Sequence, residues 1–194
     1  MLDATIRRIV TSPLDPLADG LARAGVPANA LTIGGFAIGL VAAALIADEA
    51  FLLGVIFLAL NRVADILDGM VARRTGMTPL GAFLDASLDL FVYAAIPFAF
   101  ALAHQQDALA ATFLLMGLMV AAVPAITMRA RDGENQRARA LCGHSETFVA
   151  FVLMCAAPRW MFSLLAYFYG ALCFVSAGVT IASAITQYRA AQEP

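Results

Sequence analysis

Six stretches of apolar residues limit what this chain can fold into; five are long enough to form a membrane helix, and the fifth in order is short unless it extends into the preceding loop. The hydrocarbon core of a bilayer is about 30 Å thick, and a helix needs about 20 apolar residues to cross it. The chain is 62% hydrophobic and only 13% charged, whereas a soluble domain has about 45–50% apolar and about 25% charged residues. This composition excludes a water-soluble globule and predicts an all-α integral membrane protein. The six expected spans cover about 29–47, 51–73, 81–103, 108–128, 142–157 and 160–187.

The segment before the first span has a different character. Pro13 and Pro16 are expected to break it into two helical pieces. A basic amphipathic segment of this kind lies in the membrane interface and does not span the bilayer. We therefore expect an interfacial amphipathic segment over 1–27 and one six-helix membrane domain over 28–190. The residues that give the amphipathic pattern are Leu2, Ile6, Ile9 and Val10, with Arg7 and Arg8 opposite them.

Arginines are concentrated in every second loop, and this distribution predicts the orientation of the chain in the membrane. All 12 basic residues are Arg, and only Arg159 lies in a loop on the opposite side, together with Asp48, Glu49 and Asp107. The positive-inside rule places both termini and the Arg-rich loops in the cytoplasm. We expect the membrane to be a bacterial inner membrane. The arginines on that side are Arg7, Arg8, Arg23, Arg73, Arg74, Arg129, Arg131, Arg137, Arg139 and Arg189.

Four aspartates lie within the second and third apolar stretches. Charged residues inside a membrane are costly and usually functional. Asp65 and Asp68 lie about 60° apart on a helix, and Asp85 and Asp89, four residues apart, share one face. A short connection makes the two spans antiparallel neighbours. We therefore expect the four carboxylates to meet near the cytoplasmic surface.

Clustered carboxylates repel one another unless a cation neutralises them. All-oxygen ligands suit hard divalent cations such as Mg²⁺, Mn²⁺ or Ca²⁺. Four carboxylates can bridge two such ions, and two metals about 4 Å apart clamp a displacement at phosphorus. Gly69, Ala72 and Gly81 leave room for a flat ligand near the backbone, although small residues on membrane helices often serve packing alone. Arg73 beside them is a suitable partner for a phosphate.

The residues from Asp65 to Asp89, taken together, resemble a known sequence signature. This stretch reads Asp65-x₂-Asp68-Gly69-x₂-Ala72-Arg73-x₇-Gly81-x₃-Asp85-x₃-Asp89. It resembles the signature of the CDP-alcohol phosphatidyltransferase family, D-x₂-D-G-x₂-A-R-x₇₋₈-G-x₃-D-x₃-D, with every specified position filled. Asn29 and Thr32 look like the polar stretch that opens the first membrane helix in many members, although such residues are also ordinary helix caps.

The resemblance implies transfer of a phosphoalcohol from a CDP-linked donor, usually CDP-diacylglycerol, to a hydroxyl acceptor, with release of CMP. It implies that Asp65, Asp68 and Asp85 bind two Mg²⁺ or Mn²⁺ ions. Asp89 would complete the metal site and act as general base. A homodimer is expected, and no nucleic-acid partner. The residues implied on the nucleotide side of the site are Gly69, Ala72, Arg73 and Gly81, with Asn29 and Thr32 at the helix start.

Other functions and several roles stay open at the level of sequence. The membrane carboxylates could serve a cation or proton transporter, or a metal-dependent intramembrane phosphoester hydrolase that uses water in place of the alcohol. The acceptor could be glycerol phosphate, inositol phosphate, serine or another alcohol. Asn61 and Arg62 serve either helix packing, with Arg62 paired to an aspartate, or support of the metal site. Glu146 is either placed in a first helical turn because the helix dipole favours an acidic residue there, or it lines the site. The loop arginines either set orientation or bind a phosphorylated acceptor.

Overall fold

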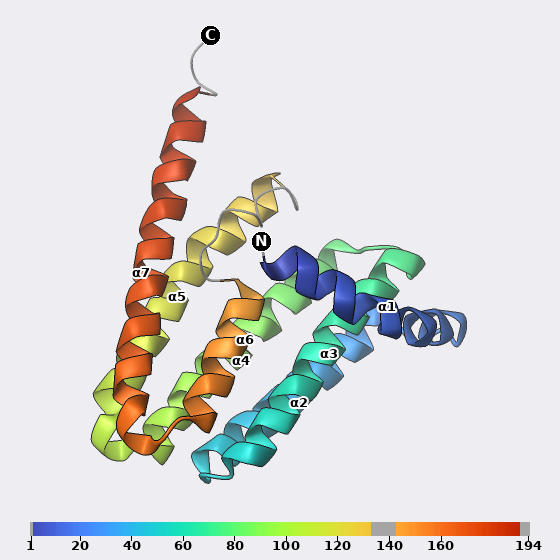
Figure 1. Cartoon of the computed structure of the whole chain (residues 1–194). Helices are drawn as coiled ribbons and strands as arrows, with labels where there is room; N and C mark the ends of the chain where they lie inside the picture. Colours follow the sequence, from blue (N-terminus) through green and yellow to red (C-terminus); the bar gives the residue numbers. More distant parts are fainter. Residues whose placement is uncertain (1, 133–142, 191–194) are drawn as a thin grey trace. The chain divides into compact units, whose positions relative to one another are not determined.

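The computed structural model describes the backbone of residues 2–132 and 143–190, and the side chains of residues 13–127 and 143–189. The described residues form seven α-helices and one 3₁₀ helix and contain no strand, which confirms the all-α class (Figure 1). The chain divides into two compact units, Met1–Ala99 and Phe100–Pro194. The helices are α1 (Leu2–Arg23), α2 (Ala28–Ala47), α3 (Phe51–Thr75), α4 (Pro79–Ala103), η1 (Gln105–Asp107), α5 (Ala108–Asp132), α6 (His144–Ala156) and α7 (Arg159–Ala190).

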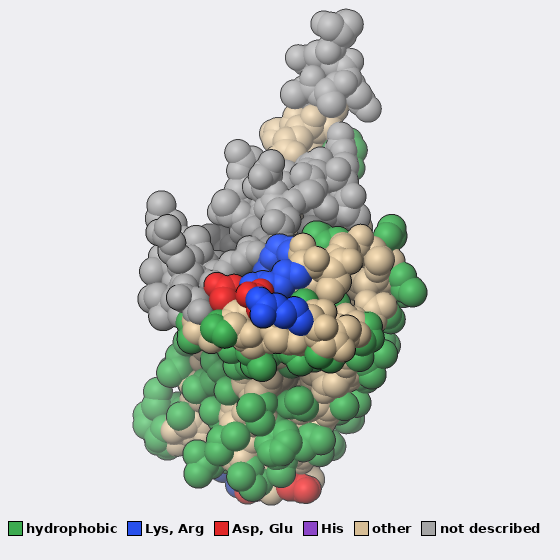
Figure 2. Space-filling view, turned by 90° about the vertical axis from the view of Figure 1, so that its right-hand side faces the viewer, with side chains coloured by type: hydrophobic (Ala, Val, Ile, Leu, Met, Phe, Trp, Pro, Cys, Tyr) green, Lys and Arg blue, Asp and Glu red, His purple; other side chains and the backbone are tan. Residues whose placement is uncertain are grey.

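Four helical stretches among the described residues are long and apolar enough to cross a membrane: Ala28–Ala47, Pro79–Ala103, Gln105–Thr127 and Arg159–Arg189. They bear large exposed apolar side chains, and hydrophobic side chains cover much of the face seen in Figure 2. The chain is therefore a multi-pass integral membrane protein. The other two predicted spans also form helices, but charged residues interrupt α3 and α6 has only 13 residues.

In the first unit, α2 and α3 lie side by side (Figure 1). Glycines allow the close approach: a Cβ atom on Gly54 would lie 2.6 Å from Ile46 Cγ1. Farther along the pair, the Asn61 side-chain amide donates a hydrogen bond to the Gly35 carbonyl at 2.9 Å. This contact fixes the rotation of α3 against α2, and therefore the direction in which the α3 carboxylates point.

A three-residue turn joins α3 to α4. Gly76 ends α3 with φ +107°, a value that side chains disfavour, and its N–H bonds the Ala72 carbonyl at 3.0 Å. Thr78 then caps α4, because its hydroxyl accepts the Gly81 N–H at 3.0 Å. Pro79 occupies the first helical position, where its missing N–H costs nothing. These residues turn the chain from α3 into α4 over three residues.

The expected break in the N-terminal segment is wrong. α1 is one helix over Leu2–Arg23, with Pro13 and Pro16 inside it. A proline removes one helical hydrogen bond, but both prolines lie on the exposed side of the helix, where water can pair the freed carbonyls. The helix packs along its other side against α3.

In the second unit, α5 and α7 lie side by side at a glycine crossing (Figure 1). A Cβ atom on Gly117 would lie 2.6 Å from the Gly170 carbonyl oxygen, so only small residues fit there. In the same unit, the buried His104 ring stacks on Phe162 with ring centroids 4.4 Å apart. Pro158 separates α6 from α7, as the sequence predicted.

Candidate active site

Three aspartates from two helices converge in the first unit. Asp65 and Asp68 come from α3 and Asp85 from α4, and one carboxylate oxygen of each lies within 4.8 Å of the others. Asp68 is buried, with 5% of its surface exposed. The convergence follows from helical periodicity on α3 and from the short turn that brings α4 back alongside it.

Asp89 lies one helical turn beyond Asp85 and outside this group of three. It lines a small pocket together with Asp65 and Asp68. The pocket volume is about 10 Å³, close to the smallest space that holds one water molecule. A space of this size cannot hold a nucleotide. The remaining lining residues are Thr32, Gly35, Phe36, Asn61, Leu88 and Val92.

The contacts of Arg62 and Asn61 match the first interpretation from the sequence, helix packing with Arg62 paired to an aspartate. The Arg62 guanidinium forms an ion pair with the Asp65 carboxylate, three residues farther along α3. Asn61 holds α3 to α2 through the Gly35 carbonyl and also lines the pocket. The side chains of Arg62 and Asp65 are 24% and 21% exposed, so this pair sits at the edge of the site.

The start of α2 contributes Thr32 to the site. The Thr32 side chain lies within hydrogen-bonding reach of the Asp68 carboxylate, and its hydroxyl also lies 3.1 Å from the Ala28 carbonyl oxygen. A hydroxyl has one proton, so it donates to only one of these at a time. Pro27 is the N-cap of α2 and no side chain caps this helix, which argues against the capping interpretation of Asn29 and Thr32.

The two motif glycines lie in different surroundings. A Cβ atom on Gly69 would meet only the Arg73 guanidinium, at 3.4 Å, among the described residues. A Cβ atom on Gly81 would lie 2.9 Å from Asn29 Oδ1 and 3.0 Å from Thr78 Oγ1. Gly69 therefore faces open space, whereas Gly81 lets the start of α4 approach Asn29 on α2.

The donor set fits a hard divalent cation. The carboxylates of Asp65, Asp68 and Asp85 offer only oxygen, and their spacing allows one ion to contact all three. A buried carboxylate such as Asp68 is costly without a positive partner. Arg62 supplies one cation at Asp65, and it lies at the edge of the group, so the side nearer Asp68 and Asp85 still suits a metal ion.

Several residues make contacts in the structure that the sequence did not predict. Phe36, Leu88 and Val92 line the pocket but look like ordinary membrane-helix residues. Asp15 and Asp19 on α1 both pair with Arg74, a contact between residues more than 50 positions apart. Glu146, whose role the sequence left open, lies in the first turn of α6 in the second unit. The side chains of the loop residues Arg129, Arg131, Arg137 and Arg139 lie outside the described part of the chain.

These features define a helical membrane protein with an acidic, metal-type site at the end of two neighbouring helices. Residues 25–188 match the family model described as CDP-alcohol phosphatidyltransferase. The chain belongs to the CDP-alcohol phosphatidyltransferase family of membrane enzymes, as its motif predicted.

Curated relatives agree with this assignment. The chain is 33% identical over 189 residues to the inner membrane protein YnjF of Escherichia coli, covering 91% of both chains. It is 40% identical over 98 residues to an archaetidylinositol phosphate synthase of Pyrococcus horikoshii, which covers 50% of this chain and 52% of that protein.

A solved structure shares the fold. The crystal structure of Mycobacterium tuberculosis phosphatidylinositol phosphate synthase with CDP-DAG bound superposes with a TM-score of 0.64. The match covers 94% of this chain and 92% of the other at 21% sequence identity. At this identity the similarity establishes a common fold.

Proposed function

We propose that this protein transfers a phosphatidyl group from a CDP-linked lipid, CDP-diacylglycerol, to a hydroxyl acceptor and releases CMP. The observation that carries the proposal is the convergence of Asp65, Asp68 and Asp85 within 4.8 Å, next to the open face of Gly69. A metal-type site and space for a ligand thus lie on the same stretch of α3.

Asp65, Asp68 and Asp85 would hold the metal, with Asp89 completing a two-ion site. Mg²⁺ or Mn²⁺ bound there would neutralise the diphosphate and the leaving CMP. Thr32 would orient the Asp68 carboxylate through its hydroxyl, and Asn61 would hold α3 in register with α2. Arg62 would neutralise part of the acidic group through its ion pair with Asp65 while no metal is bound.

The reaction is a substitution at the β-phosphorus of the donor. The acceptor oxygen forms a bond to this phosphorus, the bond from phosphorus to the CMP oxygen breaks, and CMP leaves with the electron pair. The acceptor proton passes to Asp89, whose place outside the group of three supports its assignment as base. A carboxylate fully committed to metal is a weak base, so Asp89, only partly engaged with the metal, would suit proton transfer better than Asp65 or Asp68.

The nucleotide would lie over Gly69 and Ala72, with Arg73 contacting its phosphates. The open surroundings of Gly69 support this placement, because a flat base can approach the backbone where no side chain intervenes. Gly81 would act indirectly, because the absence of a side chain there leaves room for Asn29 of α2 beside the start of α4. Arg73 is exposed and can meet a ligand that arrives from water.

The acceptor to test first is an inositol phosphate. The curated relatives include two archaetidylinositol phosphate synthases and one phosphatidylinositol phosphate synthase of Streptomyces avermitilis. They match 43–53% of this chain. Glycerol phosphate, serine and free inositol are the comparison acceptors.

We place the site on the cytoplasmic side of a bacterial inner membrane, with six spans and both termini in the cytoplasm. α3, with 25 residues, is about 37 Å long and can cross the bilayer despite its charges. α6, with 13 residues, is about 20 Å long and would need local thinning of the bilayer or extension into the preceding loop. A homodimer, formed through small residues on the membrane helices, completes the proposal.

The test is CMP release from CDP-diacylglycerol by the purified protein in detergent or nanodiscs, with Mg²⁺ or Mn²⁺ and each acceptor in turn. The proposal expects release that requires both metal and acceptor, together with a new phospholipid. Release without any acceptor, yielding phosphatidic acid, would support the hydrolase. Absence of release together with metal or proton flux in proteoliposomes would support the transporter.

A further inference from the structure

The last turns of α3 present two opposite faces. At 100° per residue, the motif residues fall within an arc of about 140°. Met70, Val71 and Arg74 fall outside this arc, on the other side of the helix. The motif face therefore has a second face directly behind it. The residues of the motif face are Asp65, Asp68, Gly69, Ala72 and Arg73.

α1 packs on this second face. Ala18 of α1 is fully buried, and Leu67, Met70 and Val71 of α3 are buried against it. Because alanine has no atoms beyond Cβ, the two helices can approach closely at this point. α1 is thus docked on the back of the helix that carries the motif.

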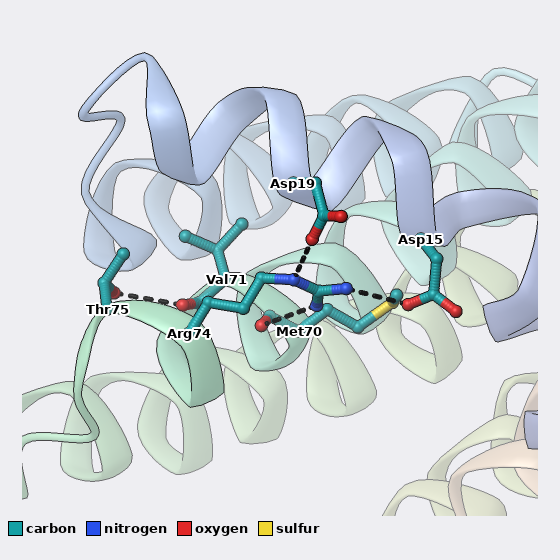
Figure 3. A network of polar contacts seen from close by, with 6 residues as sticks. All are labelled: Asp15, Asp19, Met70, Val71, Arg74 and Thr75. Atoms are coloured by element: carbon teal, nitrogen blue, oxygen red, sulfur yellow. Dashed lines mark hydrogen bonds and ion pairs between the residues drawn. The ribbon is translucent and has the colours of Figure 1, made fainter.

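Arg74 fastens α1 in this position (Figure 3). Its Nη2 donates to the Asp15 carboxylate at 2.8 Å and its Nε to the Asp19 carboxylate. Its Nη1 donates to the Met70 carbonyl on α3 at 3.1 Å. Asp15 and Asp19 are one turn apart on α1, so one guanidinium holds two points of α1 and one point of α3.

Each nitrogen of the Arg74 guanidinium has a hydrogen-bond acceptor on α1 or α3. Hydrogen bonds from Arg74 to Asp15 and Asp19 raise the pKa of its guanidinium above the ordinary value. Near the end of α3, the Arg74 side chain and the Thr75 hydroxyl donate additional hydrogen bonds to the Met70 and Val71 carbonyls, one turn back along the helix. The end of α3 is therefore held from behind by α1 and by its own side chains.

We infer that Arg74, through Asp15 and Asp19, is a positioning residue that braces the motif-bearing end of α3 for donor binding. This inference rests on the proposed function. Gly69, Ala72 and Arg73 lie within the last two turns of α3, so fraying of this end would displace the nucleotide surface first. Asp65 and Asp85 lie deeper, so the reacting groups would move less.

The experiment compares Arg74→Gln and the double variant Asp15→Asn/Asp19→Asn with Arg23→Gln, a matched control that removes one exposed arginine from α1. We expect both clamp variants to raise KM for CDP-diacylglycerol about five- to tenfold with kcat within about twofold. Combining them should add little, because residues of one network are not additive. Arg23→Gln should behave like the parent.

Hydrogen exchange provides a readout that does not depend on catalysis. The clamp variants should lose protection over residues 66–75 of α3 and 13–23 of α1 and keep it in α5 and α7. An unchanged KM in variants that lose this protection would overturn the inference, and so would unchanged protection. Equal losses of kcat and kcat/KM would assign Arg74 to general stability. If the parent protein itself releases no CMP, the proposed function fails, whereas the exchange data still decide whether the clamp holds α3.

Discussion

The Arg73 guanidinium lies beside Gly69, one turn earlier on α3, and the space over Gly69 is otherwise open. A Cβ atom on Gly69 would lie 3.4 Å from Arg73 Nη1 and would contact nothing else within 4 Å in the described part of the chain. A glycine that serves helix packing has a neighbouring helix at that distance, as Gly39 has Val92 at 2.7 Å. The surroundings of Gly69 therefore favour a ligand-facing role over a packing role.

Replacing Gly69 by Leu should block donor binding and leave the fold intact. The new side chain displaces only the flexible end of Arg73 and fills the space proposed for the nucleotide. Affinity for CDP-diacylglycerol should fall at least about tenfold, which corresponds to about 1.4 kcal/mol. The measurement is donor binding by calorimetry, with thermal unfolding as the check on folding.

Gly39→Leu is the matched control on α2. It forces a side chain against Val92 and Asn61 and should lower the unfolding temperature, since overpacking costs about 1–3 kcal/mol. A well-folded Gly69→Leu protein with unchanged donor affinity would show that the space over Gly69 is not the nucleotide site.

Asp68→Asn should abolish metal-dependent transfer. The substitution keeps the shape of the side chain but removes the charge of the most buried carboxylate among Asp65, Asp68 and Asp85. Metal binding should weaken by at least about tenfold, because charged oxygen ligands dominate affinity for hard cations. The measurement is CMP release over a Mg²⁺ titration. Asp48→Asn, at the far end of α2, is the control, and full activity of Asp68→Asn in chelator would refute the metal site.

Local rules predicted most of the helices and the acidic group. The apolar lengths gave α2, α3 and α4 to within two residues at each end, because a membrane helix must match the bilayer thickness. The 3.6-residue period placed Asp65 and Asp68 on one face, and the structure brings them to Asp85. These features depend on residues close together in sequence.

Contacts between distant segments could not be predicted in the same way. Nothing near Arg74 indicates that Asp15 and Asp19 are its partners, because their pairing depends on how α1 docks on α3. The continuity of α1 through Pro13 and Pro16 contradicts the local rule, since the prolines lie on its exposed side. The reach of Thr32 to Asp68 likewise depends on the register of α2 against α3.

Arg62→Gln should tighten metal binding and destabilise the metal-free protein. Arg62 is ion-paired to Asp65, so it neutralises part of the acidic group when no other cation is present. Its removal strengthens the attraction for a divalent ion, by about tenfold in affinity, and leaves the carboxylates to repel one another in chelator. Unfolding temperatures in EDTA and in Mg²⁺ test both effects. A variant that is less stable and also binds Mg²⁺ more weakly would instead mean that Arg62 orients Asp65 for the ion.

The assignment of the base depends on the difference between Asp85 and Asp89. Asp85 lies in the group of three carboxylates, whereas Asp89, one turn deeper on α4, lines the small pocket with Asp65 and Asp68. Asp89→Asn should therefore keep most donor affinity and lose turnover by about two to four powers of ten, the usual contribution of a general base. Asp85→Asn should lose metal binding and turnover together. The measurements are single-turnover CMP release at saturating Mg²⁺ and donor binding without acceptor. If Asp89→Asn loses metal and donor together while Asp85→Asn retains both, the roles of these two residues are reversed.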